Sequence, residues 1–228
     1  MQNKISSGAE AVDGLLEGGY EKDVITTVYG PAGSGKTCLC ILAAIGVCRE
    51  AKKVIYIDTE GGFSVDRMMQ LADDYKELLQ NMMFFKPTSF NEQMNVFEKL
   101  KEAVKENIGL IIVDSIAMLY RLELGKSEEV YKVNRELGEQ IAYLTEIARK
   151  KNIPVLITNQ VYANFDDKDK VNMVGGDILK YGSKCLVELQ IALPNKRKAV
   201  LKKHRSIQQE NEIEFLIKEK GFEKVIKK

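Results

Sequence analysis

Eight consecutive residues combine glycines with a lysine and a threonine at a spacing suited to binding a phosphate group: Gly30, Pro31, Ala32, Gly33, Ser34, Gly35, Lys36 and Thr37, followed by Cys38. Glycines let backbone N–H groups turn inward around phosphate oxygens, and the start of a following helix adds to the attraction. Lys36 would neutralise the β- and γ-phosphates, and the Thr37 hydroxyl would coordinate Mg²⁺. The segment therefore predicts a site for ATP with Mg²⁺.

Acidic side chains follow two apolar segments that would lie beside this loop. Asp114 ends the segment 110–113, where its carboxylate would hold Mg²⁺ directly or through water. Glu60 follows the segment 54–57 and would polarise an attacking water, and Asp58 is the alternative candidate in the same tetrapeptide. The sequence thus predicts one metal-binding acid and one water-activating acid.

Short segments rich in Val and Ile alternate with longer helical patterns, as in a parallel sheet covered by helices on both faces. We expect strands at 24–29, 54–57, 82–86, 110–113 and 155–158, and helices near 37–51, 65–80, 90–106 and 128–151. After Gly182 three apolar segments follow without a helix between them, at 186–191, 199–204 and 213–217. The pattern predicts an α/β fold over residues 1–228, a single domain with a mostly parallel sheet and C-terminal antiparallel hairpins.

Composition excludes several other classes of protein. With 45% hydrophobic residues and 34 basic against 33 acidic side chains, the chain can bury a core and carries little net charge. The uncharged apolar stretch 38–48 is about half the length that a membrane-spanning helix needs. Four cysteines without a CxxC spacing and a single histidine argue against a zinc site and a disulfide framework. A cytoplasmic protein with no membrane partner is expected.

The segments ISSGAEAVDGLLEGG, YIDTEGGF, LIIVDSIA and VLITNQV together resemble the core of the RecA/RadA recombinase family, over essentially the whole chain. The resemblance implies a RecA-like P-loop NTPase core in which Glu60 activates water and Lys36 and Gln160 complete the catalytic set. It also implies that Arg67 stacks on adenine. Gln160 would sense the γ-phosphate beside a DNA-binding loop.

Two departures narrow the resemblance to a paralogue that consists of the ATPase core. Recombinases of this type normally carry a further N-terminal domain with a linker that docks into a neighbouring subunit, whereas this sequence starts at the core. The second DNA loop, 161–176, is short and acidic, although Tyr162 and Phe165 could stack on bases. The resemblance then implies an accessory protein of DNA repair and homologous recombination. It would bind ATP and single-stranded or branched DNA, hydrolyse ATP weakly and perform no strand exchange. Its expected partners are a RadA-type recombinase or a Holliday-junction resolvase.

Basic residues concentrate near the C-terminus, because residues 195–228 carry 11 Lys and Arg against 5 Asp and Glu. One interpretation is a DNA-phosphate patch formed by Lys196, Arg197, Lys198, Lys202, Lys203 and Arg205. A second is that Lys203 and Arg205 touch nucleotide, as in KaiC-like regulatory ATPases that act through ring assembly and protein contacts. A third is a solvated rim of a hairpin. A small-molecule kinase would share the phosphate loop, but the RecA-like segments after the second and fifth strands argue against it.

Overall fold

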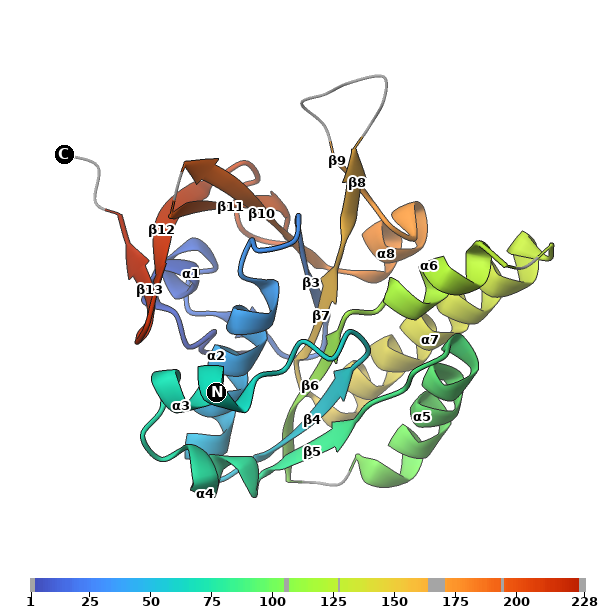
Figure 1. Ribbon diagram of the computed structural model, residues 1–228, viewed down its shortest axis with the longest axis horizontal. Coiled ribbons are helices and arrows are strands. Elements are labelled where there is room, and N and C mark those ends of the chain that lie inside the picture. Colours follow the sequence, from blue (N-terminus) through green and yellow to red (C-terminus); the bar gives the residue numbers. More distant parts are fainter. Residues whose placement is uncertain (1–2, 105–106, 127, 164–170, 194, 226–228) are drawn as a thin grey trace.

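The computed structural model describes residues 3–104, 107–126, 128–163, 171–193 and 195–225. Its main sheet has nine strands in the order β13-β12-β11-β10-β3-β7-β6-β4-β5 (Figure 1). The strands are β3 (Ile25–Tyr29), β4 (Lys53–Asp58), β5 (Met82–Phe85), β6 (Ile108–Asp114), β7 (Val155–Asn159), β10 (Cys185–Leu193), β11 (Lys196–Lys203), β12 (Glu212–Lys218) and β13 (Gly221–Lys224). Two small antiparallel pairs stand apart from it: β1 (Lys4–Ile5) with β2 (Tyr20–Glu21), and β8 (Val161–Ala163) with β9 (Val171–Met173).

Helices cover both faces of the sheet. They are α1 (Glu10–Leu15), α2 (Lys36–Arg49), α3 (Val65–Leu71), α4 (Tyr75–Leu79), α5 (Phe90–Ala103), α6 (Met118–Leu124), α7 (Val130–Lys151) and α8 (Gly176–Gly182). In Figure 1, α2, α3 and α4 lie together on one side, and α5, α6 and α7 lie on the other. Within the described ranges, no helix has the length and apolar character needed to cross a bilayer.

The strands bury both faces because alternate side chains point to opposite sides of a sheet. On β4, Val54 and Tyr56 join the apolar cluster around α2, whereas Ile55 and Ile57 join the cluster around α5 and α7. All four are fully buried. This arrangement explains why the predicted strands read as continuous apolar segments, and the predicted mostly parallel sheet is confirmed.

The predicted change after Gly182 is also confirmed. Strand β10 pairs parallel with β3 on one side and antiparallel with β11 on the other, so it joins the parallel and antiparallel parts of the sheet. Strand β13 was not expected from the sequence, since its four residues carry little apolar pattern. The helix expected at 65–80 is two helices, because Ala72 is buried in an extended conformation between α3 and α4.

Candidate nucleotide-binding site

The glycine-rich loop connects β3 to α2, at the carboxyl end of the central parallel strands (Figure 1). Gly33 has φ 73° and Gly35 has φ 105°, and both values lie in the left-handed region that favours glycine. A Cβ at Gly30 would lie 2.2 Å from the carbonyl oxygen of Leu189. Glycine is therefore required by backbone conformation at two of these positions and by the closeness of β10 at the third.

Lys36 is turned back onto this loop. Its Nζ donates to the carbonyl oxygens of Gly30, at 2.8 Å, and Pro31, at 2.9 Å. Burial lowers the pKa of Lys36, while the nearby carboxylates of Glu60 and Asp114 oppose that shift. A buried ammonium at the start of α2, beside a glycine-rich loop, is an environment that favours an anion.

Asp114 ends β6 at the floor of the same site. Its carboxylate accepts hydrogen bonds from Thr158 Oγ1 at 2.5 Å and Tyr56 OH at 3.0 Å, and Thr37 is a third donor. Burial raises the pKa of Asp114, and these hydrogen bonds oppose the shift. The Thr37 hydroxyl and the Asp114 carboxylate together offer the hard oxygen ligands that Mg²⁺ prefers, so the residues present fit a magnesium ion bound with phosphates.

Glu60 lies at the carboxyl end of β4, exposed toward the pocket. Its Oε1 accepts hydrogen bonds from Ser115 Oγ at 2.5 Å and from Gln160 Nε2 at 3.0 Å. Three neighbouring strands, β4, β6 and β7, thus bring these side chains together at their carboxyl ends. Asp58, the alternative candidate, is buried and accepts the backbone N–H groups of residues 62 and 63 at 3.0 and 3.2 Å. Asp58 therefore holds the turn, and Glu60 is the acid that faces the pocket.

A pocket of about 350 Å³ joins these groups, and most of the predicted nucleotide residues line it: Ala32, Gly33, Gly35, Lys36, Thr37, Cys38, Glu60, Asp114 and Gln160. Ile217 of β12 completes the lining and was not predicted from the sequence. Its only signal there was a place in a short apolar segment, which does not distinguish a pocket wall from core. Ser34 Oγ is buried nearby and has no hydrogen-bond partner among the described residues.

Arg67, implied to stack on adenine, lies next to this pocket but is not among the residues that line it. Its guanidinium donates to the carbonyl oxygens of Lys218 at 2.7 Å and Glu219 at 3.0 Å, and it contacts Cys38 Sγ at 3.4 Å. The arginine therefore ties α3 to the β12–β13 turn. Its role toward adenine stays a prediction.

The two predicted stacking aromatics can be placed only in part. Tyr162 is half exposed on β8 and lines a second pocket of about 610 Å³, together with Tyr120 and Arg121. Phe165 lies outside the described residues. Figure 1 shows β8 and β9 projecting beyond the carboxyl end of β7, on the same side of the sheet as the glycine loop.

The six basic residues assigned to the DNA patch are spread along β11 and the turn that follows it, and their contacts within the chain differ. Lys196, Arg197 and Lys198 lie near the glycine loop. The Nζ of Lys196 is 4.0 Å from Glu214 Oε2, and Lys198 forms an ion pair with Glu212. Arg197 Nε donates to the carbonyl oxygen of Gly33 at 2.9 Å.

Of the other three, Lys203 lies level with Thr27 in the middle of β3, because both pair with Leu186. Arg205 lies beside Glu21 and Asp23, before β3 begins. Lys202 pairs with Glu210 at 2.8 Å, and Lys203 Nζ donates to the carbonyl oxygens of residues 180 and 183 at 2.5 and 2.8 Å. Neither Lys203 nor Arg205 lines the nucleotide pocket as the structure describes it. The position of these residues within one chain therefore gives no support to a KaiC-like contact with the bound nucleotide.

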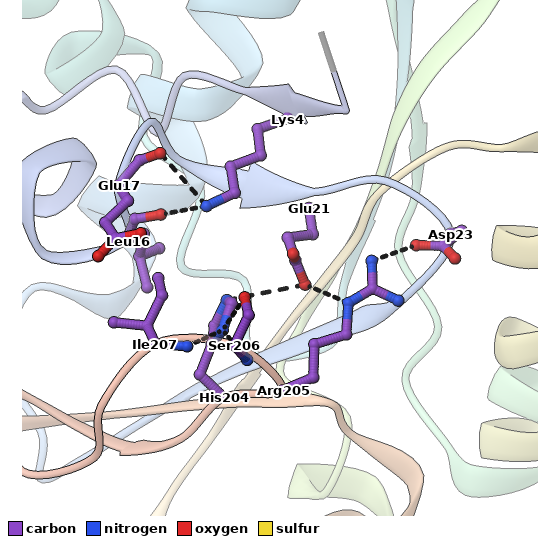
Figure 2. Close-up of polar contacts among 9 residues, drawn as sticks. All are labelled: Lys4, Leu16, Glu17, Glu21, Asp23, His204, Arg205, Ser206 and Ile207. Atoms are coloured by element: carbon purple, nitrogen blue, oxygen red, sulfur yellow. Dashed lines mark hydrogen bonds and ion pairs between the residues drawn. The ribbon is translucent and has the colours of Figure 1, made fainter. Parts of the chain in front are cut away.

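Arg205 is part of a compact polar cluster (Figure 2). Its Nε is 2.9 Å from Glu21 Oε2, and its Nη2 donates to Asp23 Oδ1 at 3.0 Å. The buried His204 lies beside them and accepts the backbone N–H groups of residues 206 and 207 through Nδ1, each at 3.1 Å. The cations of the basic segment are thus engaged by acceptors within the chain. Their contact with DNA stays a prediction.

The glycine loop between strand and helix, the acids at the neighbouring strand ends and the mostly parallel sheet define a P-loop NTPase with a RecA-like fold. Residues 2–225 of the chain match the model of the Rad51 family. The chain belongs to the Rad51 family, whose members bind ATP with Mg²⁺. The resemblance to the recombinase core is therefore confirmed.

Similar proteins share the length of this chain. The DNA repair and recombination protein RadB of Methanobrevibacter smithii is 42% identical over 217 residues, which cover 92% of each chain. RadB of Methanocaldococcus jannaschii is also 42% identical, over 92% of this chain and 97% of that protein. A solved structure titled as the RadB recombinase is 37% identical, with a TM-score of 0.83 over 97% of this chain and 100% of the other. The predicted resemblance to a paralogue of the recombinases agrees with these relatives.

Proposed function

We propose that this protein is an ATP-binding accessory of DNA repair and homologous recombination, with slow ATP hydrolysis and no strand exchange of its own. The observation that carries the proposal is the hydrogen bond between Glu60 and Gln160, at the edge of a pocket that also contains Lys36, Thr37 and Asp114. It joins the water-activating candidate to the residue at which β7 leads into β8. The names of the relatives support a role in repair and recombination.

Each polar residue of the pocket has a distinct task in this proposal. The loop N–H groups and Lys36 bind the β- and γ-phosphates, and Thr37 and Asp114 hold Mg²⁺, which neutralises charge on the phosphate oxygens. Glu60 orients a water molecule and accepts its proton. Its Oε1 is shared by Ser115 and Gln160, so the position of the carboxylate is controlled from two neighbouring strands.

Slow ATP hydrolysis is expected because the described part of the pocket offers few cationic side chains to stabilise the transition state. Among the described residues that line the pocket, Lys36 is the single Lys or Arg. P-loop enzymes that hydrolyse nucleotide fast usually add an arginine that stabilises the developing charge on the phosphate, often from a neighbouring protein. We therefore expect an isolated subunit to turn over well below about 1 s⁻¹, under the typical range of ATPases.

Gln160 offers a route from nucleotide to DNA. The carbonyl oxygen of Gln160 accepts the N–H group of Val174. The side-chain Nδ2 of Asn159 donates to the carbonyl oxygen of Val174 at 2.7 Å. Val174 follows β9, so the residues that leave the nucleotide pocket are bonded to the end of the β8–β9 hairpin. A change in the partner of Gln160 would therefore shift the hairpin that carries Tyr162.

DNA binding in this proposal uses the β8–β9 hairpin, with the basic residues of β11 as further phosphate contacts. Single-stranded or branched DNA is the ligand, because an exposed aromatic side chain can stack on an unpaired base. A RadA-type recombinase and a Holliday-junction resolvase are the partners that the family resemblance implies. The protein would regulate the recombinase or the cleavage of branched DNA rather than exchange strands itself.

The test is fluorescence anisotropy with labelled single-stranded and branched DNA across a salt series, with and without Mg²⁺-ATP. We expect Tyr162→Ala to weaken DNA binding by about 5- to 100-fold, as for the loss of one base–aromatic stack. Tyr181→Ala, which changes an exposed tyrosine on α8, is the matched control and should leave binding unchanged. A wild-type protein that binds ATP but ignores DNA at moderate salt would overturn the proposal in favour of a KaiC-like regulatory ATPase.

A further inference from the structure

Two cations hold carbonyl oxygens of the glycine loop from different directions. Lys36 Nζ donates to the carbonyl groups of Gly30 and Pro31 from within the site. Arg197 Nε donates to the carbonyl oxygen of Gly33 at 2.9 Å from β11. In a phosphate-binding loop the N–H groups turn toward the ligand, so groups that hold the carbonyl oxygens elsewhere favour the binding conformation.

Arg197 is presented to the loop by a well-supported strand. It is half-buried, and its backbone lies opposite Ile191 of β10 on one side and Phe215 of β12 on the other. Its Nη1 also donates to the carbonyl oxygen of Lys196 at 3.0 Å, which restrains the guanidinium. Alternation along the strand turns Arg197 away from the face on which Lys196 and Lys198 pair with acids of β12. The arginine is therefore separated from Lys196 and Lys198, its basic neighbours on this strand.

The part of the loop that Arg197 contacts has little other restraint. Gly33 is exposed, and a Cβ built on it would meet no atom within 4 Å. Lys36 would have to leave the carbonyl oxygens of Gly30 and Pro31 to reach a phosphate. Among the described residues, Arg197 would then make the one side-chain hydrogen bond that still holds a carbonyl group of the loop.

We propose that Arg197 is a positioning residue of the nucleotide site, which holds the Gly33 carbonyl outward so that the loop N–H groups face a nucleoside di- or triphosphate. Its positive charge beside the loop also favours a polyphosphate over an uncharged nucleoside. The inference rests on the proposed binding of ATP, and it moves Arg197 from the predicted DNA patch to the nucleotide site. Because the arginine acts on the loop, ADP and ATP should depend on it equally.

The test uses Arg197→Gln, Arg197→Lys and a matched control, Arg135→Gln, which removes the same group from an exposed position on α7. Affinities for fluorescent ADP, ATP and adenosine analogues are measured by titration, and thermal unfolding without ligand is followed for each variant. We expect Arg197→Gln to weaken the binding of ADP and ATP by about 5- to 20-fold, less than the full effect of one charge-assisted hydrogen bond because the arginine acts through the loop. Arg197→Lys should recover part of that loss, and Arg135→Gln should bind like the wild type. The unfolding temperature should hardly change.

Three results would overturn the inference. If Arg197→Gln bound nucleotide normally but lost DNA affinity, the arginine would be a DNA contact. If the loss were confined to ATP, it would act on the γ-phosphate rather than on the loop. If adenosine binding fell as much as ADP binding, the variant would have damaged the pocket as a whole. A wild-type protein that bound neither ADP nor ATP would overturn the proposed function as well, which separates the two failures.

Discussion

The two ends of β3 hold much of the charge that the sequence singles out, and they use it in opposite ways. At the carboxyl end, Lys36, Glu60 and Asp114 line an open pocket. At the amino end, Arg205 lies between Glu21 and Asp23, next to the buried His204 (Figure 2). The first group surrounds a pocket that a ligand can fill, whereas the charges of the second group pair with one another.

The difference lies in where each charge finds its partner. In the pocket, Lys36 donates, among the contacts of the described residues, to loop carbonyl oxygens. An arriving phosphate can replace these with a stronger, charged acceptor. In the amino-end cluster, the side chain of Glu21 is 8% exposed and already carries its cation, so nothing is gained by moving either group to a ligand. A charge cluster is therefore a binding candidate only where its partners are not already supplied by the chain.

The amino-end cluster also has a structural task. Glu21 belongs to β2, and Arg205 follows β11, so the ion pair ties the antiparallel β1–β2 pair to the C-terminal strands. Lys4 adds a contact within the N-terminal segment, because its Nζ donates to the carbonyl oxygens of Leu16 at 2.7 Å and Glu17 at 3.2 Å. We interpret this end of the sheet as a fold-stabilising contact.

The largest effect that would sharpen the comparison is expected from Glu60→Gln. The amide cannot accept a proton from water, so steady-state ATP hydrolysis should fall by about 100-fold or more. Nucleotide affinity should stay within about twofold, since Glu60 is assigned to water rather than to the phosphates. Phosphate release and nucleotide titration measure the two properties separately.

The matched control is Glu50→Gln, an exposed acid after α2 that pairs with Lys52 and does not line the pocket. It should hydrolyse ATP at the wild-type rate. Unchanged hydrolysis in Glu60→Gln would show that the carboxylate between Ser115 and Gln160 does not activate water. The carboxyl end of the sheet would then bind nucleotide without the proposed chemistry.

A smaller effect, on stability, is expected from Arg205→Ala. Removal of the guanidinium leaves the largely buried Glu21 without its cation, which should cost about 1–2 kcal/mol of the free energy of unfolding. Partial exposure of Arg205 keeps the expected cost below that of a fully buried pair. Urea denaturation measures the change, and nucleotide affinity should be unaffected.

A double-mutant cycle tests whether this cost belongs to the ion pair. With Glu21→Gln in place, Arg205→Ala should cost less, because the uncompensated charge is gone. A variant with wild-type stability and a large loss of DNA affinity would contradict the structural role of the cluster. The amino end of β3 would then have to be counted as a ligand site.

The sequence predicts the residues of the pocket better than the contacts of the basic segment. Each predicted pocket residue can be recognised from the residues next to it in the chain. Glu60 and Asp114 each follow a strand that is legible from its own residues, and the carboxyl ends of parallel strands lie at one edge of a sheet. The start of α5 is legible in the same way, since Ser89 Oγ accepts the N–H group of Glu92 as its sequence position suggests. These inferences need no knowledge of distant partners.

Contacts between distant residues account for what the sequence did not reveal. Arg205 meets Glu21 across 184 positions, and Arg67 meets Lys218 across 151, so no local pattern indicates either pair. Alternation along β11 separates Arg197 from its neighbours only once the strand is known to lie between β10 and β12. Helices of six or seven residues, such as α1 and α8, are too short to show a helical period.

The smallest effect concerns the pH dependence of stability at His204. Burial lowers the pKa of His204, and Lys4 and Arg205 act in the same direction, whereas Glu21 and Glu17 oppose them. An unfolded histidine titrates near pH 6.5, so between that value and the lower folded pKa the unfolded chain binds more protons. Stability from this group is therefore present above about pH 6.5 and is lost as the pH falls toward the folded pKa.

His204→Asn isolates this contribution from the other titrating groups, because its amide oxygen can accept a hydrogen bond but does not titrate. Between pH 7.5 and 5.5 the wild type should lose more unfolding free energy than the variant, by under about 1 kcal/mol. Urea denaturation at several pH values measures it. A wild type that instead gained stability on acidification would show that an ion pair between His204 and Glu21 outweighs burial, because protonation would then favour the folded state.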